Sequence, residues 1–287
     1  MAVIGYILVS LSGLAVGWLA NIVAQRLPNE NRPLFGHLHC VRSGEKLRWY
    51  DTLPLFGYLA QGGKCRHCGK KLPLRFVVLE SLILVCLLVA WPLYTPFGLG
   101  AYFFNAFAMV LLITIGAIDW RLRLIFPIMI YLGLLVAFLA PLIAPGTQGQ
   151  NSRVPENLWS VGGGMLLGAG FFLLIYWLAL SIYRVRALGF GDVLLAMLIG
   201  AESGFPQVVS VLFLGSIIGG IAALIIYVSG RKKSHDFIPY GTWMCVGAVL
   251  NFIFGNAVWQ FGPLRTLAGL LDLIFTIVSL WINRVFV

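Results

Sequence analysis

Charged side chains are scarce in this chain of 287 residues: Lys, Arg, Asp and Glu together make up 10% of it, and only ten residues are acidic. Hydrophobic residues make up 60%, and the mean hydropathy is +0.93. A soluble globular domain carries about 25% charged residues, so this composition excludes one. The sequence instead predicts a polytopic membrane protein.

Cysteines are also few, and their positions exclude a disulfide framework. Cys86 and Cys245 lie within apolar runs and are expected to be small core residues. Cys40, Cys65 and Cys68 lie in a segment that we predict below to be cytoplasmic. In that reducing compartment metal binding is favoured over disulfide formation.

Apolar runs long enough to cross a bilayer, about 20 residues each, recur along the whole chain. We count eight of them and one short candidate. The first run lacks the basic start and cleavage site of a removed signal peptide, so we expect it to remain as a helix. The sequence therefore predicts an all-α fold, a polytopic membrane helical bundle of about nine spans. The runs are 3–25, 76–94, 100–118, 125–144, 159–182, 206–228, 237–255 and 266–283, with 192–203 as the short one.

Basic residues gather in the loops of one side, so the net charge of +10 does not require a nucleic-acid partner. If the N-terminus faces outward, eighteen of the twenty Lys and Arg residues lie on the cytoplasmic side, and only Arg153 and Arg265 lie outside. This asymmetry requires the short run 192–203 to cross the membrane, because otherwise the later basic loops would fall on the wrong side. We therefore predict nine spans rather than eight, with the lipid bilayer as a partner.

Three regions follow from this topology: a first transmembrane helix over 1–26, a small cytoplasmic loop domain over 27–75, and a membrane bundle over 76–287. The loop domain is too small to hold a good core alone, so a bound metal would stabilise it. Cys65 and Cys68 form a C-x-x-C pair followed by a glycine, which is typical of a zinc knuckle.

The remaining ligands of such a metal site stay open at this point. Cys40 can supply a third thiolate, and Ser43 stands where a second C-x-x-C pair would end. His37, His39 or His67 could be the fourth ligand, because zinc accepts mixed Cys and His sets. The alternative is a loop without metal that is held by packing alone.

Two acids are expected at the cytoplasmic ends of apolar runs, where carboxylates are costly and mark functional sites. Asp119 follows the third run, and Asp192 begins the short one behind Gly189 and Gly191, which permit close backbone approach. Two carboxylates at one depth can share a proton and activate a water, as in an aspartic protease. The alternative is two separate acids, each paired with a neighbouring arginine such as Arg121 or Arg186.

Three other polar residues lie within the runs. Glu80, about one turn inside the cytoplasmic face, either reaches back to Arg75 or belongs to a functional polar pocket. Asn21 is expected to form an interhelical hydrogen bond or to join such a pocket. Asp272, in the middle of the last run, suggests only an interhelical hydrogen bond or a protonated acid.

Seven segments, taken in order, resemble the type IV prepilin peptidase family, whose members are membrane aspartic proteases of the GxGD type that also methylate their product. The sequence departs from the family at Ser43, which replaces a cysteine, at Leu194, which replaces a usual lysine, and at Ile128, where Asp commonly follows Pro127. The matching segments are 17–28, Cys40 with Cys65 and Cys68, 49–54, 75–80, 118–119, 189–192 and 238–241.

The resemblance implies that Asp119 and Asp192 are catalytic, supported by Gly189 and Gly191, within an aspartic protease bundle over 76–287. It implies removal of the basic leader from type IV prepilins or from pseudopilins of type II secretion. The reaction would take place at the cytoplasmic face of the bacterial inner membrane.

Two cofactors are implied by the same resemblance. S-adenosylmethionine would supply the methyl group, with Asp51 and Glu80 as candidate contacts, and zinc would bind the loop domain. Because the sequence departs from the family at Ser43 and Leu194, a peptidase that does not methylate its product is an alternative. A third reading, from another class, is a non-enzymatic transporter or assembly scaffold.

Overall fold

The computed structural model of the chain describes residues 2–28, 56–65, 69, 71–143, 154–183, 189–228 and 239–259. Regular structure in these residues is helical, apart from one isolated antiparallel bridge between Lys64 and Lys71. The predicted all-α membrane bundle is confirmed. The helices are α1 (Ala2–Arg26), α2 (Phe56–Ala60), α3 (Arg75–Tyr94), the short 3-10 helix η2 (Thr95–Phe97), α4 (Leu99–Leu122), α5 (Pro127–Ile143), α6 (Leu158–Tyr183), α7 (Phe190–Ser203), α8 (Val208–Val228) and α9 (Tyr240–Trp259).

Each predicted run from 3–25 to 237–255 coincides with one of these helices to within a few residues, and the last run, 266–283, lies outside the described residues. Five helices in the described ranges are long and apolar enough to cross a membrane, and 127–142 and 240–255 are shorter apolar helices. The five are Val3–Arg26, Arg75–Phe97, Leu99–Leu122, Leu158–Ile182 and Val208–Ile225.

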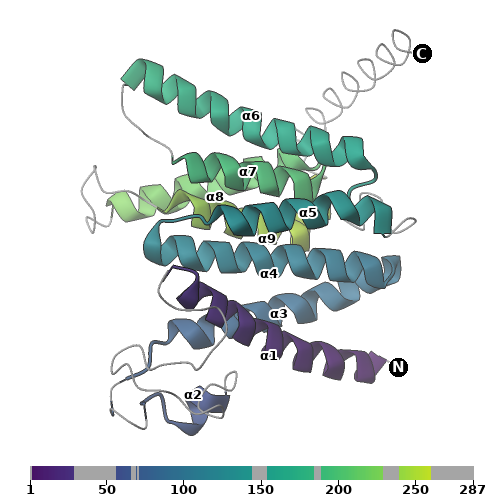
Figure 1. The fold of residues 1–287 in the computed structure, drawn as a ribbon, viewed down its shortest axis with the longest axis vertical. Coiled ribbons are helices and arrows are strands. Elements are labelled where there is room, and N and C mark those ends of the chain that lie inside the picture. Colours follow the sequence, from purple (N-terminus) through teal and green to yellow (C-terminus); the bar gives the residue numbers. More distant parts are fainter. Residues whose placement is uncertain are drawn as a thin grey trace.

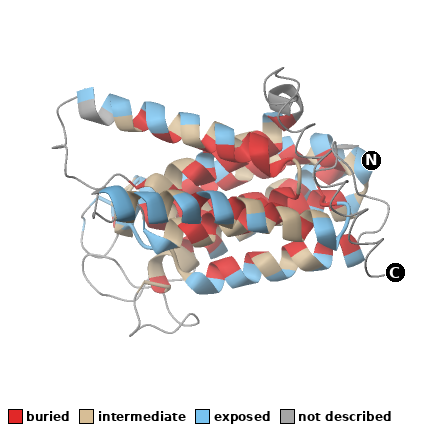
Figure 2. Ribbon diagram, turned by 90° about the horizontal axis from the view of Figure 1, so that it is seen from above, coloured by how far each residue is buried: buried red, intermediate tan, exposed pale blue. Residues whose placement is uncertain are grey.

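Helix α4 occupies the centre of the bundle, with α1 and α3 on one side of it and α5, α7, α8 and α9 on the other (Figure 1). Its side chains Met109, Leu112 and Ile115 are almost completely buried and belong to the main hydrophobic core. Helix α6 is outermost and exposes large apolar side chains such as Leu174 and Trp177, as a lipid-facing helix does. Buried residues concentrate in the interior helices, as Figure 2 shows.

The short helix α7 is enclosed by its neighbours, which explains how 14 residues can hold a defined place in the bundle. A Cβ atom added to Gly200 of α7 would overlap the backbone of Gly164 in α6, and one added to Gly168 would overlap the backbone of Ala196. These contacts bring two helix backbones together without intervening side chains. On the next face, Leu198 of α7 packs over Gly133 of α5.

Candidate active site

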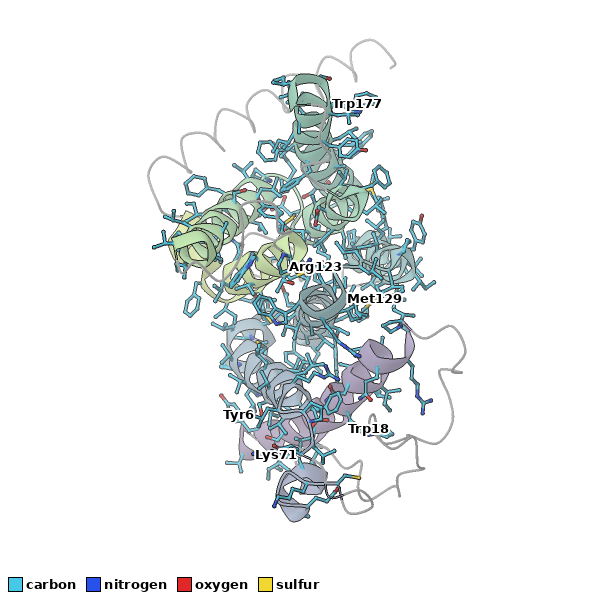
Figure 3. The ribbon with its side chains drawn as sticks, turned by 90° about the vertical axis from the view of Figure 1, so that its left-hand side faces the viewer. Tyr6, Trp18, Lys71, Arg123, Met129 and Trp177 are labelled. Atoms are coloured by element: carbon cyan, nitrogen blue, oxygen red, sulfur yellow. The ribbon has the colours of Figure 1, made fainter. Side chains whose placement is uncertain are left out.

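Asp119 lies in the last turn of α4, which continues to Leu122, four residues beyond the end of the predicted run. Arg123 ends the helix in the left-handed conformation, with φ of 56°, and its backbone N–H donates to the carbonyl oxygen of Asp119 at 2.8 Å. Only 5% of Asp119 is exposed, so its carboxylate depends on protein partners rather than on water. In the view of Figure 3, Arg123 lies near the middle of the molecule, between α1 on one side and Trp177 of α6 on the other.

Thr242, in the first turn of α9, holds the Asp119 side chain. Its backbone N–H donates to Asp119 Oδ2 at 2.7 Å, and its hydroxyl lies 2.8 Å from the same oxygen. The hydroxyl also lies 3.1 Å from the carbonyl oxygen of Gly116, one turn earlier in α4. Because a hydroxyl donates only one hydrogen, it can turn between Asp119 and Gly116 as the carboxyl gains or loses a proton.

Asp192 occupies the first turn of α7 and is half-buried. Its Oδ2 accepts a hydrogen bond from the backbone N–H of Gly189 at 3.1 Å, so the carboxylate caps the start of its own helix. A helix N-terminus favours a negative charge at this place. The backbone of Gly189 is extended, with φ of −77°, a conformation that any residue adopts.

Ile125, in the connection between α4 and α5, packs against Gly191 of α7 and Gly241 of α9. A Cβ atom on Gly191 would lie 3.2 Å from Ile125 Cβ, so a residue larger than glycine would push against this side chain. On the other side, a Cβ atom on Gly241 would lie 3.1 Å both from Ile125 Cδ1 and from Asp119 Oδ2. Two glycines thus let α7 and α9 pack closely against Ile125.

The two carboxylates lie near enough for Asp119 to act electrostatically on Asp192. Tyr240 joins this group, since Asp192 also acts on its hydroxyl, which lies 3.5 Å from Ser216 Oγ. Asp119 accepts its hydrogen bonds from Thr242, and the neighbouring arginine that acts on it electrostatically is Arg123.

Glu80 and Asn21 form a second polar group, between α3 and α1. Asn21 Nδ2 donates to Glu80 Oε1 at 2.8 Å and to the carbonyl oxygen of Phe76 at 3.0 Å. Both side chains are buried. Asn21 thus forms the interhelical hydrogen bond that we expected as one of its two roles.

The predicted zinc ligands are described only at Cys65, which is buried in the loop domain. Its carbonyl oxygen accepts a hydrogen bond at 2.8 Å from the N–H of Gly69, whose φ is +64°. In the described residues no group of three metal-binding side chains occurs. The other predicted zinc ligands lie outside the described residues: Cys40, Cys68, His37, His39 and His67. Asp51 and Asp272 also lie outside them.

Two residues, Thr242 at this site and Glu202 away from it, have no counterpart in the expectations from sequence. Thr242 follows the segment 238–241, which carries part of the family resemblance, and nothing in its own chemistry distinguishes it from other threonines in apolar helices. Glu202, at the other end of α7, is 1% exposed, and both its carboxylate oxygens lack a hydrogen-bond partner among the described residues. A signal for Glu202 was available, because an acid inside an apolar helix is costly.

Two family profiles match the chain. The one described as the Bacterial Peptidase A24 N-terminal domain matches residues 11–93, and the one described as the Type IV leader peptidase family matches residues 106–224. The second range contains both Asp119 and Asp192, and the first contains Cys40, Cys65 and Cys68.

Curated relatives cover most of the chain. It is 28% identical over 225 residues to a protein of Xanthomonas campestris pv. campestris, a match that covers 76% of this chain and 72% of the relative. It is 26% identical to a protein of Vibrio cholerae, with 86% and 95% covered, and 25% identical to one of Pseudomonas aeruginosa, with 86% and 90% covered. All three are named prepilin leader peptidase/N-methyltransferase. Among the solved structures no significant match was found.

Proposed function

We propose, because the chain belongs to the type IV leader peptidase family, that it removes the basic leader from type IV prepilins or pseudopilins and then methylates the new N-terminus. It is a multi-pass protein of the bacterial inner membrane. We place the N-terminus outside and the two aspartates at the cytoplasmic face, on the strength of the charge asymmetry of the loops.

The observation that supports cleavage most strongly is the pair of aspartates at one end of the bundle, with Thr242 holding one of them. Neighbouring carboxyl groups resist double ionisation and share a proton. The ionised member would take a proton from water, and the protonated member would donate to the carbonyl oxygen of the scissile peptide. A prepilin carries its basic leader in the cytoplasm and its apolar helix in the bilayer, so its scissile bond lies at the proposed depth of the pair.

Cleavage is tested with the purified protein in lipid bilayers and a prepilin of the same organism. Mass spectrometry should find a product that has lost the leader and gained one methyl group when S-adenosylmethionine is present. An intact prepilin after prolonged incubation would contradict the proposal.

Methylation depends on S-adenosylmethionine, which supplies the methyl group for transfer to the amine. Glu80, one of its candidate contacts, is buried and accepts a hydrogen bond from Asn21. Asp51 lies outside the described residues. We keep Asp51 and Glu80 as the candidate contacts of the cofactor.

A peptidase without methylation is the second candidate, and two sequence departures favour it. Ser43 removes a loop cysteine, and Leu194 packs, partly buried, against the hydrophobic core where a polar lysine would otherwise stand. An unmethylated N-terminal amine on correctly cleaved product, formed with S-adenosylmethionine present, would identify this activity.

We also propose a zinc site at Cys65, Cys68 and Cys40, completed by one of His37, His39 and His67. The turn at Gly69 and the Lys64–Lys71 bridge support it, because a C-x-x-C knuckle needs a backbone that folds back around the ion. Metal analysis should find one zinc per chain in the native protein and none after Cys65→Ser. Equal zinc contents would contradict the assignment, and Cys86→Ser is the matched control.

A further inference from the structure

A cavity of about 800 Å³ lies between α3, α4 and α9, with residues of α1 at one end. Its walls are apolar along most of their length, with Leu79 and Leu82 from α3, Leu112 from α4 and Val249 from α9 among them. Neither Asp119 nor Asp192 lines it. Thr242, which holds Asp119, lies at one end of its lining, so the cavity adjoins the proposed cleavage site.

The cavity spans the depth of one leaflet. Its lining on α3 runs from Arg75 to Cys86 and on α9 from Thr242 to Ile253. At 1.5 Å per residue each wall is about 16 Å long, close to half of the roughly 30 Å of a bilayer's hydrocarbon core. Tyr94 donates a hydrogen bond to the carbonyl oxygen of Phe252, which joins α3 to α9 at the end of α3 remote from Arg75.

Two arginines lie at the end of the cavity that is remote from Tyr94. Arg75 and Arg121 both line it, and Arg121 repels Arg75 electrostatically. The guanidinium of Arg75 lies over the ring of Phe76, 5.1 Å from its centroid, and in the described part of the chain neither arginine forms an ion pair with an acid. A shared anionic ligand would relieve this repulsion, and phosphate is well matched to two guanidinium groups.

We propose that this cavity binds an anionic phospholipid of the cytoplasmic leaflet, with the phosphate at Arg75 and Arg121 and the acyl chains along the apolar walls. Basic pockets between helices at the cytoplasmic side bind acidic headgroups in this way. The transmembrane helix of a prepilin fits less well, because it crosses both leaflets, whereas the cavity extends over one. The inference depends on the proposed orientation only for the choice of leaflet, and it does not depend on the proposed enzymatic activity.

The headgroup contacts are tested by native mass spectrometry of the detergent-purified full chain, titrated with phosphatidylglycerol or with phosphatidylcholine of the same acyl chains. Wild-type protein should bind one phosphatidylglycerol at least 10-fold more tightly than phosphatidylcholine. The double variant Arg75→Gln/Arg121→Gln should lose this preference, since each basic contact contributes measurably to acidic-lipid binding. The control Lys64→Gln/Lys71→Gln removes the same charge at exposed positions outside the lining and should keep it.

The acyl-chain contacts are tested by filling the cavity without changing charge. Leu82→Trp should reduce phosphatidylglycerol binding roughly 10-fold, whereas Val85→Trp, on an exposed position of the same helix outside the lining, should not. Equal binding of the two lipids by wild type, or an unchanged preference in the double arginine variant, would overturn the proposal. So would a prepilin whose binding is blocked by Leu82→Trp while lipid binding stays intact, because the cavity would then hold the substrate.

Discussion

Thr242 gives Asp119 two hydrogen bonds from one residue, through its backbone N–H and its hydroxyl. The backbone bond does not involve the side chain, so replacing Thr242 by valine measures the contribution of the hydroxyl alone. We predict that Thr242→Val slows leader cleavage roughly 10- to 100-fold, as expected for loss of a hydrogen bond to a charged group at about 1.5–3 kcal/mol.

Thr242→Ser is the matched control, because it keeps the hydroxyl and loses only a methyl group. Its rate of cleavage should stay within a few-fold of wild type. If the valine variant cleaves as fast as the serine variant, the hydroxyl does not tune Asp119. Rates should be measured under single-turnover conditions, where product release does not hide the chemical step.

At the scale of whole elements, the contact between α6 and α7 fixes where Asp192 lies. Gly164 and Gly200 meet backbone to backbone, so a side chain at either position must separate the helices. We predict that Gly200→Leu reduces cleavage strongly and lowers the thermal stability of the purified protein, because overpacking costs typically 1–3 kcal/mol or more. Cleavage assays and thermal unfolding in detergent would measure both effects.

Gly170→Leu provides the control on α6, since a Cβ atom there meets nothing within 4 Å. It should leave both readouts unchanged. A Gly200→Leu protein with wild-type stability and activity would show that α7 does not depend on this close contact.

The helices themselves could be predicted from apolar run length, and this includes α7, whose 14 residues were recognised from the charge balance of the loops around it. The residues at which α4 and α9 end could be predicted less closely from the sequence. Asp119 was expected just beyond a helix and lies within its last turn, because the left-handed Arg123 ends α4 later than the apolar run does.

The site could be predicted only in part, for a related reason. Asp119 and Asp192 stand out because acids are rare in apolar sequence. Thr242 lies 123 residues from Asp119, and only the packing of α9 on α4 brings the two together. Local patterns carry no information about that contact, and an ordinary threonine in an apolar helix gives no sign of it.

For the molecule as a whole, the orientation in the membrane depends on whether α7 crosses it. We predict that alkaline phosphatase, which is active only outside the cytoplasm, is active when fused after residue 156 or after residue 205. Green fluorescent protein fused after residue 123 should fluoresce. This pattern follows from the charge asymmetry that assigns the basic loops to the cytoplasm.

The fusion after residue 205 is decisive, because it is the one that changes side if α7 does not cross. An inactive phosphatase there, with an active one after residue 156, would remove α7 from the spans. It would also place the basic segment Arg231–Lys233 on the outer side, against the predicted asymmetry.

The central claim is that Asp119 and Asp192 act together in peptide hydrolysis. It is tested most directly by measuring leader removal from a prepilin in membranes that carry Asp119→Asn, Asp192→Asn or the exposed control Glu156→Gln, at matched protein levels. The account predicts no detectable cleavage by either asparagine variant, since an amide can neither take up nor release the shared proton, and wild-type cleavage by the control. Full cleavage by either asparagine variant would contradict it.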